Sequence, residues 1–108
     1  MEKQRRKRIT VNVHAELIVE GKIYAGVIEN ISECGICVSA SLSEFAMIIP
    51  GTRLDIKFAS AGNQINLQCT VIWVLMNKTA KGLRYKMGME IIEESCLEFK
   101  NFLKTPYL

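Results

Sequence analysis

The segment ITVNVHAELIV, residues 9–19, alternates apolar and polar side chains almost without interruption. Its apolar positions are Ile9, Val11, Val13, Ala15, Leu17 and Val19. Successive side chains of a β-strand point to opposite faces, so this pattern predicts a strand with one buried face. Such a long half-buried strand near the start of the chain favours a mainly β fold.

The same alternation recurs along most of the chain and is interrupted by short turns such as Glu20-Gly21 and Gly62-Asn63. Connections of that length join antiparallel neighbours rather than parallel ones. A small antiparallel sheet loses its exposed edges by closing, so we predict a six-stranded antiparallel β-barrel. The further strands are predicted over residues 22–28, 36–40, 52–59, 64–75 and 83–91.

Two features of the later strands carry specific expectations. Trp73, Phe99, Phe102 and the methionines of the last strand are expected in the core, because they fall on apolar faces. Gly88 interrupts the outer face of its strand, which predicts a bend or the close approach of another group.

The end of the chain changes period. Cys96, Phe99 and Leu103 recur at spacings of three to four residues, and Pro106 follows them. This pattern predicts a C-terminal α-helix over residues 93–104, which would cover one opening of the barrel.

Length and composition are those of one globular domain. The chain has 108 residues, of which 49% are hydrophobic, so a single domain over residues 1–108 is expected. No apolar run approaches the roughly 18 residues of a membrane-spanning helix, and no signal-peptide core follows the charged start. We therefore predict a soluble, cytoplasmic protein without a membrane span.

Positive charge is concentrated at the start of the chain. The net charge is +3, and five of the 14 lysines and arginines lie within residues 3–8, which leaves nine basic and ten acidic residues beyond this segment and Glu2. Residues 1–8 are thus predicted to form a flexible basic arm. A local positive field suits a compact anion better than a long nucleic acid.

The four cysteines give little support to a metal or redox site. Cys34 and Cys37 are spaced as Cys-x-x-Cys, but Cys69 and Cys96 are isolated and His14 is the only histidine. A strand over this stretch would also point Cys34 and Cys37 to opposite faces. We expect reduced thiols that act as small apolar side chains, and no metal or cofactor.

The segment Asn30-Ile31-Ser32-Glu33-Cys34-Gly35 lies between the second and third predicted strands. Asn, Ser and Gly at this spacing favour a tight turn, in which side-chain oxygens bond nearby backbone N–H groups and the glycine adopts a positive φ. Arginine adds a fixed charge and a planar set of donors. The turn and the basic arm together predict a pocket for a small, doubly phosphorylated ligand.

These elements resemble the PilZ domain family of bacterial cyclic di-GMP receptors. The resemblance covers nearly the whole chain: an arginine cluster precedes the first strand, Asn30-x-Ser32-x-x-Gly35 follows the second, and the segments at 71–73 and 85–90 are similar to later strands of the family. It implies a PilZ-like split barrel with a C-terminal helix, and cyclic di-GMP as the ligand. The binding residues that it implies are Arg5, Arg6, Arg8, Asn30, Ser32 and Gly35.

The arginine motif departs from the family pattern. PilZ receptors carry Arg-x-x-x-Arg, and with Arg8 as the second arginine the first position holds Gln4. The primary hypothesis is a nucleotide-binding signal-transduction domain that acts on a separate effector protein in motility, exopolysaccharide production or biofilm formation. The alternative is a degenerate PilZ adaptor that binds a protein without nucleotide.

Other classes of function receive less support. No paired carboxylates, Ser–His arrangement or glycine-rich phosphate loop is present, so no catalysis is predicted. Nucleic-acid binding would need surface aromatic side chains for base stacking, and the aromatic residues fall mainly on predicted inward or helical positions.

Overall fold

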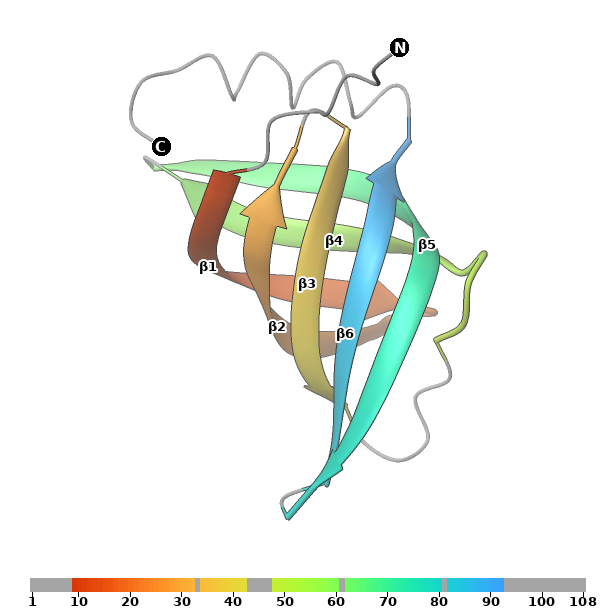
Figure 1. Cartoon of the computed structure of the whole chain (residues 1–108). Helices are drawn as coiled ribbons and strands as arrows, with labels where there is room; N and C mark the ends of the chain where they lie inside the picture. The colour runs from red at the N-terminus through yellow and green to blue at the C-terminus, as the bar shows by residue number, and fades with distance from the viewer. Residues whose placement is uncertain (1–8, 33, 43–47, 61, 81, 93–108) are drawn as a thin grey trace, which may run out of the picture.

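The computed structural model describes residues 9–32, 34–42, 48–60, 62–80 and 82–92 (Figure 1). The predicted mainly β class and the six antiparallel strands are confirmed. The strands are β1 (Ile9–Val19), β2 (Lys22–Ile31), β3 (Gly35–Leu42), β4 (Arg53–Ser60), β5 (Asn63–Thr79) and β6 (Gly82–Ile91).

The strands pair in the order β1-β2-β3-β6-β5-β4 and form a closed barrel. Closure depends on a short ladder in which Glu16, Leu17 and Ile18 of β1 face residues 55–57 of β4. The other neighbours pair over longer stretches, as Figure 1 shows for β3, β5 and β6. This order brings β2, β3, β6 and β5 side by side in one curved wall.

The core occupies the interior of the barrel and consists of the inward side chains of all six strands. Leu17, Ile28, Ile56, Leu67 and Met87 are completely buried. Each such side chain stabilises the fold by about 1.5–3 kcal/mol relative to an exposed position. The inward faces predicted for β4 and β6 are confirmed by this burial. In β1 the prediction is confirmed for Ala15, Leu17 and Val19, whereas Ile9 at its start is 37% exposed.

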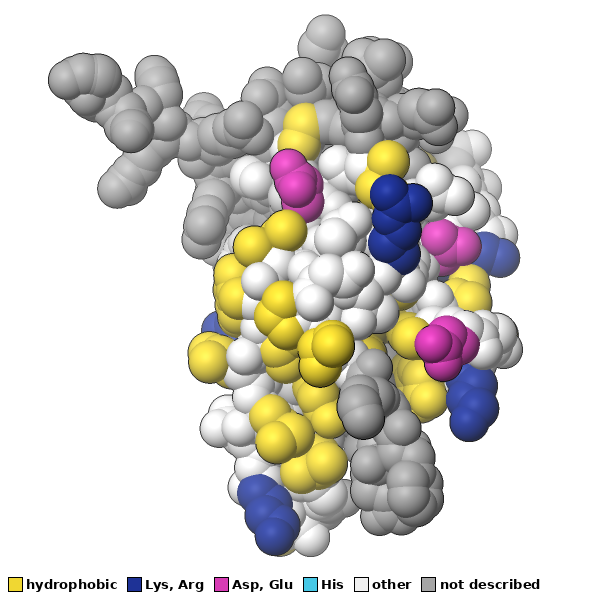
Figure 2. Space-filling model, turned by 90° about the vertical axis from the view of Figure 1, so that its right-hand side faces the viewer, with side chains coloured by type: hydrophobic (Ala, Val, Ile, Leu, Met, Phe, Trp, Pro, Cys, Tyr) yellow, Lys and Arg dark blue, Asp and Glu magenta, His cyan; other side chains and the backbone are white. Residues whose placement is uncertain are grey.

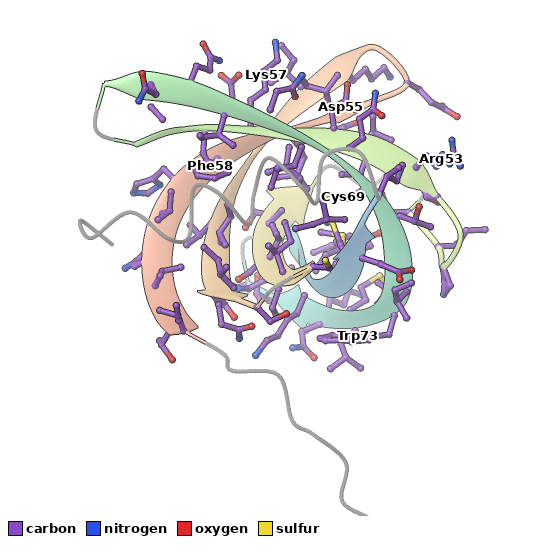
Figure 3. All side chains as sticks on the ribbon, turned by 90° about the horizontal axis from the view of Figure 1, so that it is seen from above. Arg53, Asp55, Lys57, Phe58, Cys69 and Trp73 are labelled. Carbon is purple, nitrogen blue, oxygen red and sulfur yellow. The ribbon has the colours of Figure 1, made fainter. Side chains whose placement is uncertain are left out.

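Register shifts typical of β-bulges interrupt the alternation in three strands. One lies in β1 between Thr10 and Val13, one in β2 between Ile28 and Asn30, and one in β5 between Val71 and Trp73. A bulge adds one residue to a strand and thereby reverses which side chains point inward after it. The expected core position of Trp73 is therefore wrong: its side chain is 41% exposed and lies outside the barrel (Figure 3). Met87 and Met89 are buried, as predicted.

The hairpin of β5 and β6 is longer than the sequence pattern indicated. β5 extends to Thr79 and β6 begins at Gly82, so residues 76–79, which lie between the predicted strands, continue the ladder. The hairpin turn lies at the lower end of the molecule in Figure 1, and β3 pairs with β6 as far as Leu83. The predicted basic arm (1–8) and C-terminal helix (93–104), with Phe99 and Phe102, lie outside the described residues. The part of the chain that is described holds no helix able to cross a membrane.

Candidate functional site

A pocket of about 310 Å³ lies on the outer surface of the wall formed by β2, β3, β6 and β5. It opens beside the turn that connects β2 to β3. The residues that line it are Asn30, Ser32, Gly35, Ile36, Cys37, Ile72, Trp73, Lys86, Gly88 and Met89.

The register of the strands explains this grouping. Asn30 pairs with Cys37, Cys37 pairs with Gly88, and Gly88 pairs with Trp73, so these four residues form one row across four strands. The bulges of β2 and β5 lie at the two ends of this row. Of the two central residues, Cys37 has a small side chain and Gly88 has none. The surface is therefore hollow between the amide of Asn30 at one end and the indole of Trp73 at the other.

The indole of Trp73 lies directly against the backbone of Gly88. A Cβ atom placed on Gly88 would be 2.1 Å from Nε1 and 2.3 Å from Cε2 of this indole. No side chain fits in that space, so glycine is required for Trp73 to hold this position. The close approach predicted at Gly88 is confirmed, and the approaching group is this indole.

The turn between β2 and β3 is held by its own hydrogen bonds. The Ser32 N–H donates to the Gly35 carbonyl at 2.8 Å, and the Ser32 hydroxyl donates to the same oxygen at 3.2 Å. The Ile91 N–H donates to the Cys34 carbonyl at 2.8 Å, which ties the turn to the end of β6. The motif serine thus fixes the turn through a carbonyl, where the sequence suggested a bond to an N–H group.

The positive φ expected at Gly35 is wrong, since the glycines with positive φ are Gly21, Gly51, Gly62 and Gly82. Glycine is favoured at position 35 for a different reason. A Cβ atom there would lie 3.3 Å from both the Met89 carbonyl oxygen and the Ser32 hydroxyl oxygen. The absence of a side chain lets β3 and the turn pack closely against β6.

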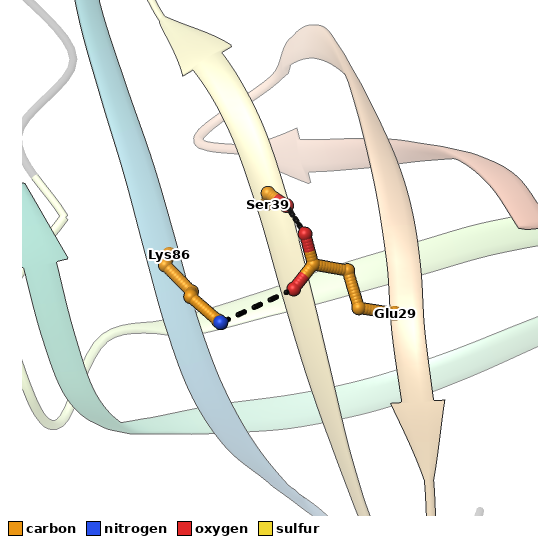
Figure 4. Close-up of polar contacts among 3 residues, drawn as sticks. All are labelled: Glu29, Ser39 and Lys86. Atoms are coloured by element: carbon orange, nitrogen blue, oxygen red, sulfur yellow. Dashed lines mark hydrogen bonds and ion pairs between the residues drawn. The ribbon is translucent and has the colours of Figure 1, made fainter. Parts of the chain in front are cut away.

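Lys86 supplies positive charge to the pocket and is held from one side by an acidic residue (Figure 4). Its Nζ atom lies 3.5 Å from Oε1 of Glu29, and the buried Ser39 donates its hydroxyl to the other carboxylate oxygen. The Ser39 hydrogen bond and then the charge of Lys86 lower the pKa of Glu29, against the opposing effect of burial. Glu29 is therefore ionised at neutral pH and positions the Lys86 ammonium.

Three of the six residues predicted for the site lie together in this pocket, namely Asn30, Ser32 and Gly35. The other three, Arg5, Arg6 and Arg8, fall outside the described residues. The structure adds Trp73 and Lys86, which the sequence analysis did not assign to the site. Gly88 was the available signal for Trp73, whereas Lys86 had none because its position depends on strand register.

The cysteines follow the predicted role only in part. Cys37 and Cys69 are buried thiols outside any disulfide, as expected. Burial, and to a smaller extent the charge of Asp55, raises the pKa of Cys69 to about 12. Cys34, in contrast, is disulfide-bonded, so the prediction of a reduced thiol is wrong at this position.

Taken together, these features define a domain built on a closed antiparallel sheet, with a pocket on the outside of the barrel. The sequence profile of the PilZ domain matches residues 2–103, so the chain belongs to the PilZ domain family. No curated protein matches the chain at a significant level.

Several solved structures share the fold. The PilZ domain of CeSA from a cellulose-synthesizing bacterium is 22% identical, with a TM-score of 0.60, and the match covers 92% of this chain and 99% of that one. The K. pneumonia MrkH–c-di-GMP complex is 13% identical, with a TM-score of 0.68 and coverage of 95% and 52%. Bacillus subtilis MotI/DgrA, an inhibitor of motility, is 17% identical, with a TM-score of 0.63 and coverage of 96% and 52%. The chain spans about half the length of the latter two proteins.

Proposed function

We propose that this chain is a receptor domain for cyclic di-GMP, which it binds in the pocket beside the β2–β3 turn. The observation that carries the proposal is the meeting of Asn30, Ser32 and Gly35, the residues of the family motif, in one pocket with Trp73 and Lys86. Membership of the PilZ family supports the choice of ligand, as do the c-di-GMP complexes of MrkH and of the Borreliella burgdorferi PlzA protein.

The lining groups suit the two chemical parts of this ligand. The exposed indole face of Trp73 can stack on a guanine, which contributes about 1–3 kcal/mol per base in other nucleic-acid sites. The amide of Asn30 can both donate and accept hydrogen bonds at a base edge. The Lys86 ammonium attracts a phosphate but provides no planar donor set.

The pocket alone is too small for the whole ligand. About 310 Å³ is at the lower end of the 300–1,000 Å³ that small-molecule sites occupy, and a cyclic dinucleotide carries two bases and two phosphates. Another segment must therefore cover the rest of the ligand. Lys86 is also the only basic side chain among the described lining residues, so further positive charge has to come from elsewhere.

We assign this role to the basic arm. β1 begins at Ile9, which pairs with Ile31, and the next pair is Thr10 with Asn30. Arg8 precedes Ile9 in the chain, so the arm joins the barrel beside the motif turn. In the proposed complex Arg8, with Arg5 or Arg6, binds a guanine through O6 and N7 or grips a phosphate.

The output of this binding is proposed to be a change in the surface offered to a separate effector protein, in a cytoplasmic pathway such as motility or exopolysaccharide production. The chain acts here as a binding domain and not as an enzyme. A second candidate, a PilZ adaptor that binds its effector without nucleotide, is favoured by one feature only, which is Gln4 in place of the first arginine of the motif.

Calorimetric titration of the full chain with cyclic di-GMP separates the two candidates, with cyclic di-AMP and GTP as controls. The receptor hypothesis predicts saturable heat with cyclic di-GMP alone. Arg8→Ala should weaken binding by about 10- to 150-fold, the value of a charged hydrogen bond of about 1.5–3 kcal/mol. The matched control Lys22→Ala removes an exposed charge from the other end of β2 and should bind normally. Absence of heat with the wild-type chain would favour the adaptor.

A further inference from the structure

The outer face of β5 carries an apolar row that continues beyond the pocket, formed by Ile72, Trp73 and Leu75. These side chains are 50%, 41% and 58% exposed. Val74 is partly buried against the core, so its neighbours Trp73 and Leu75 point to the outer face. Figure 2 shows hydrophobic side chains gathered on this side of the molecule. Contiguous exposed apolar residues of this kind mark interaction surfaces in soluble domains.

A basic row lies directly beside the apolar row, on β6. Leu75 pairs with Lys86, and Arg84 lies on the same face as Lys86 because the buried Tyr85 separates the two. Both basic side chains are exposed, and residues 72–89 contain no aspartate or glutamate. The outer face of this hairpin therefore presents apolar side chains with positive charge along one side.

The dimensions of the two rows fit a short α-helix. Ile72 and Leu75 are three positions apart, which corresponds to about 10 Å along a strand. Apolar residues at positions i, i+3 or i+4, and i+7 of a helix also extend over about 10 Å. A helix that lays such a stripe on the apolar row places one of its flanks over Lys86 and Arg84, where carboxylates would meet opposite charge.

We propose that this surface binds an amphipathic helix of a partner protein, whose apolar stripe is bordered on one side by acidic residues. A helix is a narrow ridge and fits a single apolar row that borders the hollow of the pocket, whereas the flat surface of a bilayer does not. The inference gives a chemical class to the effector and rests on the proposed function for the role of the contact in signalling. The contact itself is tested without nucleotide.

Selection of helices on the full chain tests the proposal. The probe is a phage-displayed library of peptides of about 16 residues, long enough to form a helix, with leucines fixed at helical spacing and all other positions random. Aspartate and glutamate should be enriched along one flank of the leucines. A synthetic peptide of the selected sequence should bind the wild-type chain in calorimetric titration.

Two variants assign the binding to the two rows. Leu75→Asp should weaken the peptide by at least about tenfold, because it removes a central apolar contact. Arg84→Glu should weaken it by about fivefold, the upper value of an exposed ion pair, and a peptide with lysines in place of its acidic residues should recover that affinity. Arg84 is chosen because Lys86 lines the pocket and is paired with Glu29.

The matched control is Ile23→Asp on β2, which changes a side chain that is 62% exposed, comparable to the 58% of Leu75, and should bind the peptide as the wild type does. The proposal is overturned if no binding peptide is selected, if the selected peptides lack an acidic flank, or if Ile23→Asp and Leu75→Asp lose equal affinity. Flotation of the chain with vesicles of phosphatidylcholine and phosphatidylglycerol, abolished by Leu75→Asp, would assign the surface to a membrane and overturn it as well. A chain that binds cyclic di-GMP but no peptide refutes this inference alone, and the converse result refutes only the nucleotide site.

Discussion

Replacing Gly88 by alanine should remove the indole of Trp73 from the pocket. The added methyl group would lie 2.1 Å from Nε1, whereas nonbonded heavy atoms pack at about 3.5 Å, so one group must move by about 1.4 Å. The backbone of Gly88 is paired with Cys37 on one side and with Trp73 on the other. The indole is partly exposed and free to move outward, so it yields first.

The expected effect on stability is modest. Lifting the indole exposes about 80 Å² of apolar surface, which costs about 2 kcal/mol. Alanine recovers about 0.5–1 kcal/mol because it restricts the unfolded chain more than glycine does. The net loss of about 1 kcal/mol corresponds to a fall in Tm of about 5 °C for a domain of this size.

The expected effect on ligand binding is larger. If Trp73 stacks on a guanine, its displacement removes about 1–3 kcal/mol and weakens the affinity for cyclic di-GMP by about 5- to 150-fold. Tryptophan emission, thermal unfolding and calorimetric titration measure the three consequences. In a double-mutant cycle, Gly88→Ala should cost almost nothing once Trp73 is alanine. A Gly88→Ala variant with wild-type emission, Tm and affinity would refute this account of the site.

Three further predictions concern other parts of the site and the core. Glu29→Gln should release Lys86 and strengthen cyclic di-GMP binding several-fold in titration. The pKa of Glu29 is lowered in the folded chain, so the stabilisation by its carboxylate exists above the ordinary glutamate pKa and fades as pH falls through the lowered value. The variant lacks this carboxylate, and its Tm should therefore fall less steeply at acid pH. An unchanged acid limb would contradict this. Cys69, with a pKa raised to about 12, should resist alkylation by iodoacetamide at mildly alkaline pH until the chain unfolds. Its contribution to stability should be lost as pH rises above the ordinary pKa of a thiol, because the unfolded chain then loses the proton first. Rapid alkylation of Cys69 in the native chain, located by mass spectrometry, would contradict this. Gly35→Val should lower Tm and weaken binding together, because its side chain meets the Met89 carbonyl, and a normal Tm would contradict the packing argument.

The strands were predictable because burial on one face leaves a period of two in the sequence. The alternation at residues 9–19 coincides with β1, and the apolar positions 54, 56 and 58 coincide with the buried face of β4. The ends of β5 and β6 were less predictable. Polar residues 77–79 resemble a loop when considered alone, and they continue the ladder because a partner strand is already aligned beside them.

The outward direction of the Trp73 side chain could not be predicted in the same way. A single extra residue in β5 reverses which side chains point inward. Both faces of β5 are apolar around this point, so no polar residue in the sequence shows which face is exposed. The sequence did contain an indirect sign in Gly88. An outward-facing glycine in a strand needs a neighbour that uses its space, and only the register shows that this neighbour is Trp73.

The bulges of β2 and β5 explain why the site forms at this point of the barrel. They lie in β2 and β5, separated by β3 and β6, and the register brings both to the row of Asn30 and Trp73. In a sheet without bulges, the side chains of these strands would alternate in step with those of their neighbours, and the outer surface would be flat. Because each bulge turns its strand locally, the amide and the indole stand at the rims of the row while Cys37 and Gly88 form its floor. The alternation that builds the core therefore has to fail at two matched positions for a pocket to exist on the outside.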